Sequence, residues 1–263
     1  MEYQDAKTEQ SARYKRIAII TGASSGIGEA TARRLVNGGY SVIGNGRNQD
    51  KLNRLQMELG EAFQGIAGDA ADPVIQDLLF EQAIEHFGRE ADAVIVNAGR
   101  GLGGAVSNAD LIQFEEVVRT NLVGALSLMQ KAAQKMIARL ERCPFPEYSA
   151  DIVVIGSTVG RQISPFSAVY GSTKFAVHSL VEGLRRELSI KGIRVSLVEP
   201  GMVLSGFQQG AGYSDSMVEG LKDKYGPLLQ GDDIARGIEF ILEQPPYVHV
   251  GDIVIRPVRQ DYP

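Results

Sequence analysis

The sequence has no tryptophan, a single cysteine and three histidines among its 263 residues. Cys143 cannot form a disulfide within the chain, so the composition gives no indication of an oxidising compartment. No apolar run approaches the roughly 20 residues that cross a bilayer. The first 14 residues, MEYQDAKTEQSARY, contain no apolar segment typical of a signal peptide. These absences predict a cytoplasmic protein that does not associate with membranes.

Concentrated charge is missing as well. The formal net charge is −5 and there is no basic block, which argues against binding to nucleic acid. His, Cys, Asp and Glu do not cluster at metal-ligand spacing, so we expect no catalytic metal. What the sequence has in excess is glycine, with 30 residues, which is about 11% of the chain against an average near 7%.

Short apolar runs alternate with helical segments along most of the chain. Strands are expected at 16–21, 40–44, 63–67, 93–96, 152–155, 194–198 and 253–255. Helices are expected at 26–37, 49–59, 73–87, 111–140, 168–190 and 232–243. This alternation implies a parallel sheet covered by helices on both faces. We predict a single α/β domain at 15–263, a Rossmann-type doubly wound sheet of about seven strands, preceded by a flexible arm at 1–14.

The first glycine cluster, TGASSGIG at 21–28, lies between the first expected strand and helix. Such a turn lets the backbone approach a pyrophosphate, whose charge is then bound at the helix N-terminus. No Gly-Lys-Ser/Thr follows, which excludes a P-loop. The cluster also matches the G-x-S-x-G pattern of hydrolases, but only His249 lies in an expected loop where a triad histidine would be found. A dinucleotide-binding turn is therefore favoured over a hydrolase nucleophile or a plain structural turn.

The end of the second expected strand bears on the choice of dinucleotide. A carboxylate there would bind the ribose 2′-OH of NAD, but the sequence has Asn45-Gly46-Arg47-Asn48. Arg47 suits a phosphate, which favours NADP with NAD as the alternative; a solvated surface arginine is the other interpretation. A second glycine-rich segment, 99–104, opens no helix, and we interpret it as a flexible loop of the active site.

Five motifs follow one another along the chain: TGASSGIG, Asn97-Ala98-Gly99, Asn121, Ser157 and Tyr170-Gly-Ser-Thr-Lys174. On these motifs the chain resembles the short-chain dehydrogenase/reductase family from about Lys15 onward. Tyr170 and Lys174 stand four residues apart, and so on one face of an expected helix. The resemblance implies an NAD(P)-dependent oxidoreductase that transfers hydride between a nicotinamide and a carbonyl or alcohol.

The resemblance implies four catalytic residues. Tyr170 would exchange a proton with the reacting oxygen as general acid or base. Lys174 would lower the pKa of that phenol, which is near 10 in free tyrosine, and would bind the nicotinamide ribose. Ser157, with Thr158 as the alternative hydroxyl, would hydrogen-bond the substrate oxygen. Asn121 would hold a water that connects Lys174 to solvent.

A cofactor site and a lid are also implied. The expected cofactor contacts are Gly22, Ser24, Ser25, Ile27, Gly28, Arg47, Asp69, Asn97, Gly99, Tyr170, Lys174, Pro200, Gly201 and Val203. Ser205 is a further candidate for an amide or phosphate contact. The segment at about 201–230 combines glycines with apolar residues, which suits a mobile lid over the substrate.

The substrate is expected to be a small molecule. The C-terminal stretch is similar to the 3-hydroxy acid (serine-type) dehydrogenase branch, which implies an acid semialdehyde or 3-hydroxy acid. Ser157 and Tyr170 would contact the reacting oxygen, and Arg161, with Arg256 or Arg259, would pair with the acid group. The alternatives are a reductase of a non-acidic ketone (acyl, steroid or terpenoid type) and an NADP(H) sensor without turnover. The resemblance further implies a homotetramer, or a homodimer, paired through helices 111–140 and 168–190.

Overall fold

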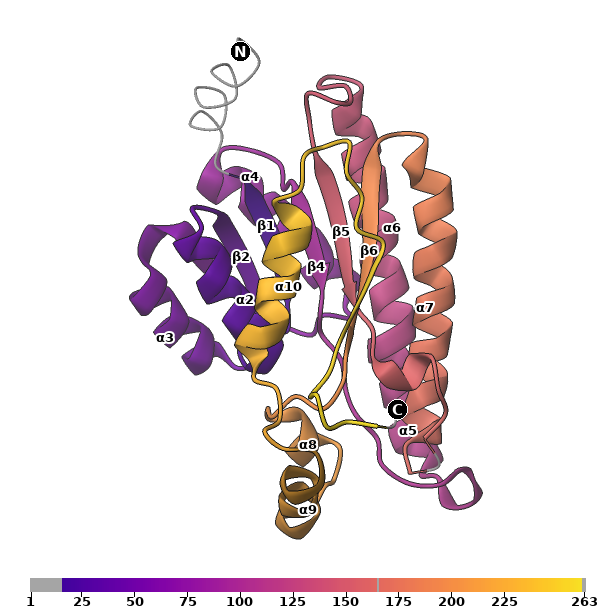
Figure 1. Cartoon of the computed structure of the whole chain (residues 1–263). Helices are drawn as coiled ribbons and strands as arrows, with labels where there is room; N and C mark the ends of the chain where they lie inside the picture. Colours follow the sequence, from indigo (N-terminus) through magenta and orange to yellow (C-terminus); the bar gives the residue numbers. More distant parts are fainter. Residues whose placement is uncertain (1–15, 165, 262–263) are drawn as a thin grey trace.

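Seven parallel strands form one sheet in the order β3-β2-β1-β4-β5-β6-β7 (Figure 1). The computed structural model describes residues 16–164 and 166–261, so the arm predicted at 1–14 lies outside the described residues. The strands are β1 Ile17–Thr21, β2 Ser41–Gly46, β3 Phe63–Ala67, β4 Ala93–Val96, β5 Ala150–Ile155, β6 Ile193–Pro200 and β7 Asp252–Ile255. The strand order reverses between β1 and β4, which makes the carboxyl edge there the expected ligand-binding position. The predicted doubly wound sheet of seven strands is confirmed.

Helices cover both faces of the sheet. One face carries α2 Gly26–Asn37, α3 Gln49–Leu59 and α10 Gly231–Leu242, and the other carries α4 Pro73–Phe87, α6 Ala125–Leu140 and α7 Ala168–Ser189 (Figure 1). Successive residues of β1 point to opposite faces, so Ile17 and Ile19 join one apolar core while Ala18 and Ile20 join the other. Burial on both faces explains why this strand is apolar throughout rather than alternating.

The helix predicted at 111–140 is not continuous. It consists of α5 Leu111–Val118, a π-helical segment η3 Arg119–Gly124, and α6. The Asn121 side chain in η3 bonds to the backbone of Arg100, in the loop after β4. A Cβ on Gly124 would lie 2.7 Å from the Cβ of Ala71. These two contacts with other parts of the chain, which a helical period does not reveal, accompany the wider turn.

The segment predicted as a lid lies beyond the carboxyl edge of the sheet and carries two helices, α8 Phe207–Gly210 and α9 Asp215–Tyr225 (Figure 1). Its two ends pair, because Leu204 N donates to Leu229 O at 2.7 Å. The C-terminal tail also holds it: Arg259 donates to Gly226 O at 3.1 Å and to Asp223 O at 3.3 Å. The stretch at 201–213, which was predicted to be irregular, contains the short helix α8.

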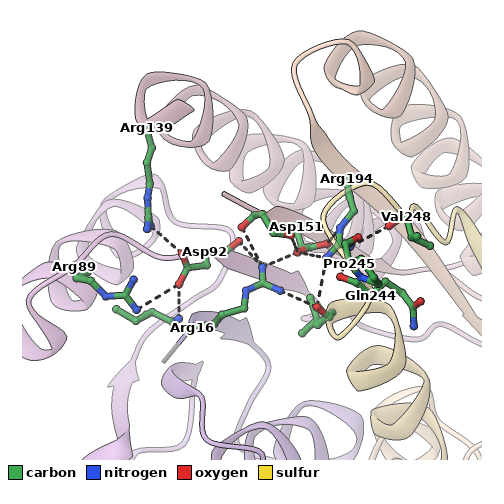
Figure 2. A network of polar contacts seen from close by, with 12 residues as sticks. Arg16, Arg89, Asp92, Arg139, Asp151, Arg194, Gln244, Pro245 and Val248 are labelled. Atoms are coloured by element: carbon green, nitrogen blue, oxygen red, sulfur yellow. Dashed lines mark hydrogen bonds and ion pairs between the residues drawn. The ribbon is translucent and has the colours of Figure 1, made fainter. Parts of the chain in front are cut away.

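The opposite edge of the sheet holds a network of buried charges (Figure 2). Asp151, at 1% exposure, accepts from Arg16 at 2.6 Å and from Arg194 at 2.7 and 2.8 Å. Asp92 pairs with Arg139 at 3.0 Å and accepts from Ile17 N at 2.7 Å. Arg194 also donates to three carbonyl oxygens of the turn before β7, those of Gln244, Pro245 and Val248. The network joins the starts of four strands to that turn.

Short connections complete the chain. The described residues include three 3₁₀ segments, η1 Gly60–Ala62, η2 Val106–Asn108 and η4 Thr158–Gly160. Cys143 is exposed in the loop between α6 and β5. Within the parts of the chain that the structure describes, no helix is both long and apolar enough to cross a bilayer.

Candidate active site

The glycine turn between β1 and α2 has no room for a side chain at Gly22 or Gly28. Gly22 and Gly26 have positive φ angles of 71° and 57°, a region that favours glycine. A Cβ on Gly28 would overlap with the carbonyl of Gly22, and one on Gly22 would lie 2.8 Å from the Asn97 amide nitrogen. The backbone of the turn therefore lies directly against the start of α2, as an anion-binding turn requires.

Thr21 ties this turn to the loop after β4. Its hydroxyl oxygen accepts from Asn97 N at 3.1 Å and from Ala98 N at 3.0 Å, and the Asn97 amide donates back to Thr21 O at 2.8 Å. The same loop brings Gly99 close to Asn121, since a Cβ on Gly99 would lie 3.4 Å from Asn121 Oδ1. The sequence interpretation missed the linking role of Thr21, although its place before the first glycine was a usable signal.

The ends of β2 and β3 carry Arg47 and Asp69. Arg47 is exposed and, among residues 16–164 and 166–261, forms no hydrogen bond or ion pair. Asp69 pairs with Arg119 at 2.6 Å and accepts from Ala71 N at 2.9 Å. Burial opposes ionisation of Asp69, but these two bonds outweigh it and lower the pKa of the carboxyl. Asn45 Oδ1 is buried beside them without a partner in the described chain.

The four residues predicted to be catalytic come from three segments that meet at the carboxyl edge. Asn121 lies in η3, Ser157 follows β5, and Tyr170 and Lys174 occupy successive turns of α7. Asn121 is 2% exposed; its amide bonds to both the N–H and the C=O of Arg100 at 2.8 Å. It also donates to Thr173 Oγ1 at 3.2 Å. This set of bonds fixes η3 against α7 and the loop after β4.

Lys174 is buried and its ammonium donates to Ile155 O, the last residue of β5, at 2.7 Å. Its Nζ lies 5.9 Å from the centre of the Tyr170 ring. Burial lowers the pKa of Lys174 to about 8, because a desolvated ammonium loses the hydration that favours its charge.

Tyr170 departs from the expected electrostatics. The resemblance implies a pKa lowered by Lys174, but burial raises the pKa of Tyr170 above its ordinary value, and the neighbouring Ser157 side chain opposes this shift only in part. The reason is that a desolvated phenolate is costly and that the Lys174 charge is directed at Ile155 O. Ser157 is thus a hydroxyl that lies next to Tyr170.

Aromatic side chains of the lid cover Tyr170. The Phe207 ring lies 5.4 Å from the Tyr170 ring, centre to centre, at an interplanar angle of 61°. Tyr213, also in the lid, is close enough for its phenol to raise the pKa of Tyr170 slightly, after burial. Phe207 also packs on Gly101, where a Cβ would lie 2.7 Å from the ring. The lid and the loop after β4 thus enclose the phenol from two sides.

Arg161 pairs with a carboxylate of the chain itself. Its Nε and Nη2 donate to the two carboxylate oxygens of Glu199, both at 2.6 Å. Glu199 has no exposed surface, and a buried carboxylate left without its partner is strongly destabilising. Two nitrogens of Arg161 are therefore engaged by Glu199, while its side chain is 50% exposed. Of the tail arginines, Arg259 holds α9 and Arg256 lies against Gly201.

The segment after β6 leads into the lid. A Cβ on Gly201 would lie 2.7 Å from Arg256 Cβ, so Pro200-Gly201 passes directly under the C-terminal tail. Val203 O accepts from the Gln208 amide at 2.6 Å, and Ser205 Oγ accepts from Phe207 N at 3.3 Å. In the described chain, no three His, Cys, Asp or Glu residues are grouped so that they could hold a metal ion.

Comparisons with known proteins show the family of this chain. The family model for short chain dehydrogenase matches residues 16–214. The chain is 34% identical over 253 residues to a serine 3-dehydrogenase of Agrobacterium fabrum, covering 93% of this chain and 94% of that protein. It is 30% identical over 244 residues to an uncharacterized oxidoreductase of Staphylococcus epidermidis, covering 93% and 98%.

Solved structures are similar over nearly the whole chain. A closed serine dehydrogenase complexed with NADP+ has a TM-score of 0.82 and 26% identity, covering 94% of this chain and 96% of that one. A 3-ketoacyl-(acyl-carrier-protein) reductase from Brucella melitensis complexed with NADH has a TM-score of 0.83 and 26% identity, covering 93% and 98%. The chain belongs to the short-chain dehydrogenase family and is an NAD(P)-dependent oxidoreductase, as its motifs predicted.

Proposed function

We propose that this protein is an NADP(H)-dependent oxidoreductase that interconverts a small 3-hydroxy acid and the corresponding carbonyl compound. The observation that carries the reaction class is the position of the Tyr170 phenol next to the Ser157 side chain, beside the buried Lys174. These groups lie at the carboxyl edge of the sheet, and the glycine turn that follows β1 lies at the same edge. A proton donor and a second hydroxyl on the same substrate oxygen are what carbonyl reduction needs.

The nicotinamide, when bound, supplies or accepts the hydride. A phenol with a raised pKa is protonated at neutral pH, so Tyr170 is ready to give its proton to a carbonyl oxygen. Ser157 holds that oxygen, and Lys174 holds a positive charge close to the phenol. Asn121 holds α7, the helix that carries Tyr170 and Lys174, against the loop after β4.

The residues present fit a dinucleotide phosphate. The side-chain-free turn at Gly22 and Gly28 supports a pyrophosphate site at the start of α2. Arg47 is exposed at the end of β2, and its positive charge is close enough to Asp69 to help lower the pKa of that carboxyl. This position supports a 2′-phosphate contact and hence NADP over NAD. The relatives of known structure include complexes with NADP+, with NADH and with 5-hydroxy-NADP.

Arg47→Ala is expected to raise the KM for NADPH about 10–100-fold, because a hydrogen bond to a charged group is worth about 1.5–3 kcal/mol. The KM for NADH is expected to change less than twofold. Steady-state kinetics with both cofactors measure this difference. Arg54→Ala, at another exposed arginine on α3, is the matched control and leaves both values unchanged. An equal loss with both cofactors would contradict the 2′-phosphate contact.

Two substrate classes remain to be separated. The acid substrate is supported by the similarity to proteins named serine 3-dehydrogenase and to serine dehydrogenase structures. A neutral ketone or aldehyde is the second candidate, favoured by the commitment of Arg161 to Glu199. The packing of Phe207 on Tyr170 supports it as well, since an aromatic lid suits an apolar substrate.

Oxidation of NADPH with a panel of acid semialdehydes, matched by neutral aldehydes and ketones of the same chain length, tests the proposal. We expect kcat/KM at least tenfold higher for the acid members. A reversed order would establish the neutral class. NADPH binding without turnover of any compound would indicate a sensor and sink the enzymatic proposal.

We also propose that the protein is a cytoplasmic homo-oligomer, either a tetramer or a dimer. Large apolar side chains are exposed along α5, η3, α6 and α7, where the family resemblance implies subunit contacts: Leu111, Ile112, Val123, Leu126 and Phe175. Exposed apolar side chains on these helices support an interface with a second copy.

A further inference from the structure

His178 lies on α7, one turn beyond Lys174, and its side chain is only 12% exposed. In the structure its Nε2 lies 3.3 Å from the backbone nitrogen of Ser157, and the N–H of Ser157 donates to it. His178 thus contacts the residue whose hydroxyl lies against Tyr170.

The chain around Ser157 is shaped to fit the imidazole. A Cβ on Gly156 or on Gly160 would overlap with the His178 ring. The glycines therefore leave the space that the ring occupies, on both sides of the turn that carries Ser157. A side chain at either position would displace the ring from the Ser157 N–H.

Two consecutive peptide units at the end of β5 are held by three neighbours. Lys174 donates to Ile155 O at 2.7 Å, Gly156 N donates to Val198 O at 2.7 Å, and Ser157 N donates to His178. Two of the three partners are side chains one turn apart on α7, the helix that also carries Tyr170. One helix therefore sets both the phenol and the backbone that bears the serine hydroxyl.

The charges around the ring keep it neutral. Burial, then the positive charges of Lys174 and Arg161, lower the pKa of His178 to about 4. Nδ1 lies 3.7 Å from the Glu199 carboxylate, which Arg161 holds through two bonds of 2.6 Å. Asp252 lies on the far side of Arg161, at 3.7 Å. A backbone N–H donates to Nε2, so the single proton of the ring is on Nδ1, facing Glu199.

We propose that His178 is a positioning residue for the reaction: as a neutral imidazole it accepts the Ser157 N–H and thereby aims the Ser157 hydroxyl at the substrate oxygen, while Arg161 and Glu199 fix its tautomer. This inference rests on the proposed function, because it concerns the same reaction. It also gives Arg161 a role in the reaction, through Glu199 and His178, that is separate from the predicted contact with a substrate acid.

Substitution separates this role from mere packing. His178→Leu is expected to lower kcat about 10–100-fold, since a small misplacement of a reacting group costs about that much, while the KM for NADPH changes less than twofold. His178→Gln places an acceptor close to the Nε2 position and is expected to recover most of kcat. His86→Leu, at an exposed histidine on α4, is the matched control and leaves kcat unchanged.

Unchanged kcat in His178→Leu overturns the proposal, and so does an equal loss of kcat in the Leu and Gln variants. A loss confined to thermal stability or to cofactor KM overturns it too. Absence of turnover in the unsubstituted protein is a different result, since it removes the proposed function and not the hydrogen bond.

Nitrogen-15 NMR of the unsubstituted protein, labelled at its three histidines, tests the inference even if the variants fail to fold. His86→Gln and His249→Gln assign the signals. We expect His178 to show a protonated Nδ1 and an unprotonated Nε2 from pH 5 to pH 8. A proton on Nε2, or a doubly protonated ring at pH 6, overturns the proposal.

Discussion

Tyr170→Phe is expected to lower kcat for carbonyl reduction by about 10²–10⁴-fold, because it removes the general acid. The Tyr170 phenol lies next to the Ser157 side chain. Phe keeps the ring that packs on Phe207 at 5.4 Å, so the lid and the fold should be unaffected. Single-turnover kinetics with saturating NADPH measure the chemical step directly.

Cofactor binding provides the control for this variant. The dissociation constant for NADPH, measured by fluorescence titration, is expected to stay within a few-fold of the unsubstituted value, because the glycine turn and Arg47 are untouched. Tyr213→Phe removes the phenol of the lid that lies near Tyr170, and this variant is expected to keep most of kcat. If the Tyr213 variant lost as much activity as the Tyr170 variant, Tyr170 would not be the sole proton donor.

Asp151→Asn is expected to lower the free energy of unfolding by about 3–5 kcal/mol, since removing one member of a buried ion pair leaves its partners uncompensated. Asp151 is 1% exposed and is the carboxylate that both Arg16 and Arg194 contact (Figure 2). A loss of this size is a large part of the stability of a typical domain. Urea unfolding at a fixed protein concentration measures this change in the free energy of unfolding, and the m-value should stay unchanged.

Asp77→Asn is the matched control for the buried pair. Its carboxylate pairs with Lys131 on the surface, where the Asp77 side chain is 51% exposed, and such exposed pairs contribute about 0–1 kcal/mol. Equal losses from the two substitutions would show that burial does not set the value of the Asp151 network. Activity of the folded Asp151 variant should be retained, because the network lies at the sheet edge opposite to Tyr170.

Local patterns in the sequence were sufficient for most of the fold. The apolar runs gave the seven strands to within a few residues, and the predicted helix starts at Gly26, Gln49 and Pro73 coincide with those of α2, α3 and α4. These features depend on near neighbours: periodicity, a capping residue or a proline at the first turn. The same holds for Tyr170 and Lys174, because four residues within a helix always return to one face.

Contacts between distant segments could not be predicted from local patterns in the sequence. The π-helical turn at Asn121 forms where its amide meets the backbone of Arg100, and no period in 111–140 reports that meeting. The pKa of Tyr170 is raised rather than lowered because burial outweighs the nearby ammonium, and burial exists only once the lid and α7 have packed.

The sequence by itself determined the doubly wound sheet, the glycine turn and the identity of the four residues that meet at the carboxyl edge. The tertiary structure alone decided what surrounds them: Arg161 is held by Glu199, His178 accepts from Ser157, and Asp151 is shared by two arginines. The physical reason is that backbone conformation follows from nearby residues, whereas a side chain's partner depends on where a segment dozens of residues away comes to lie.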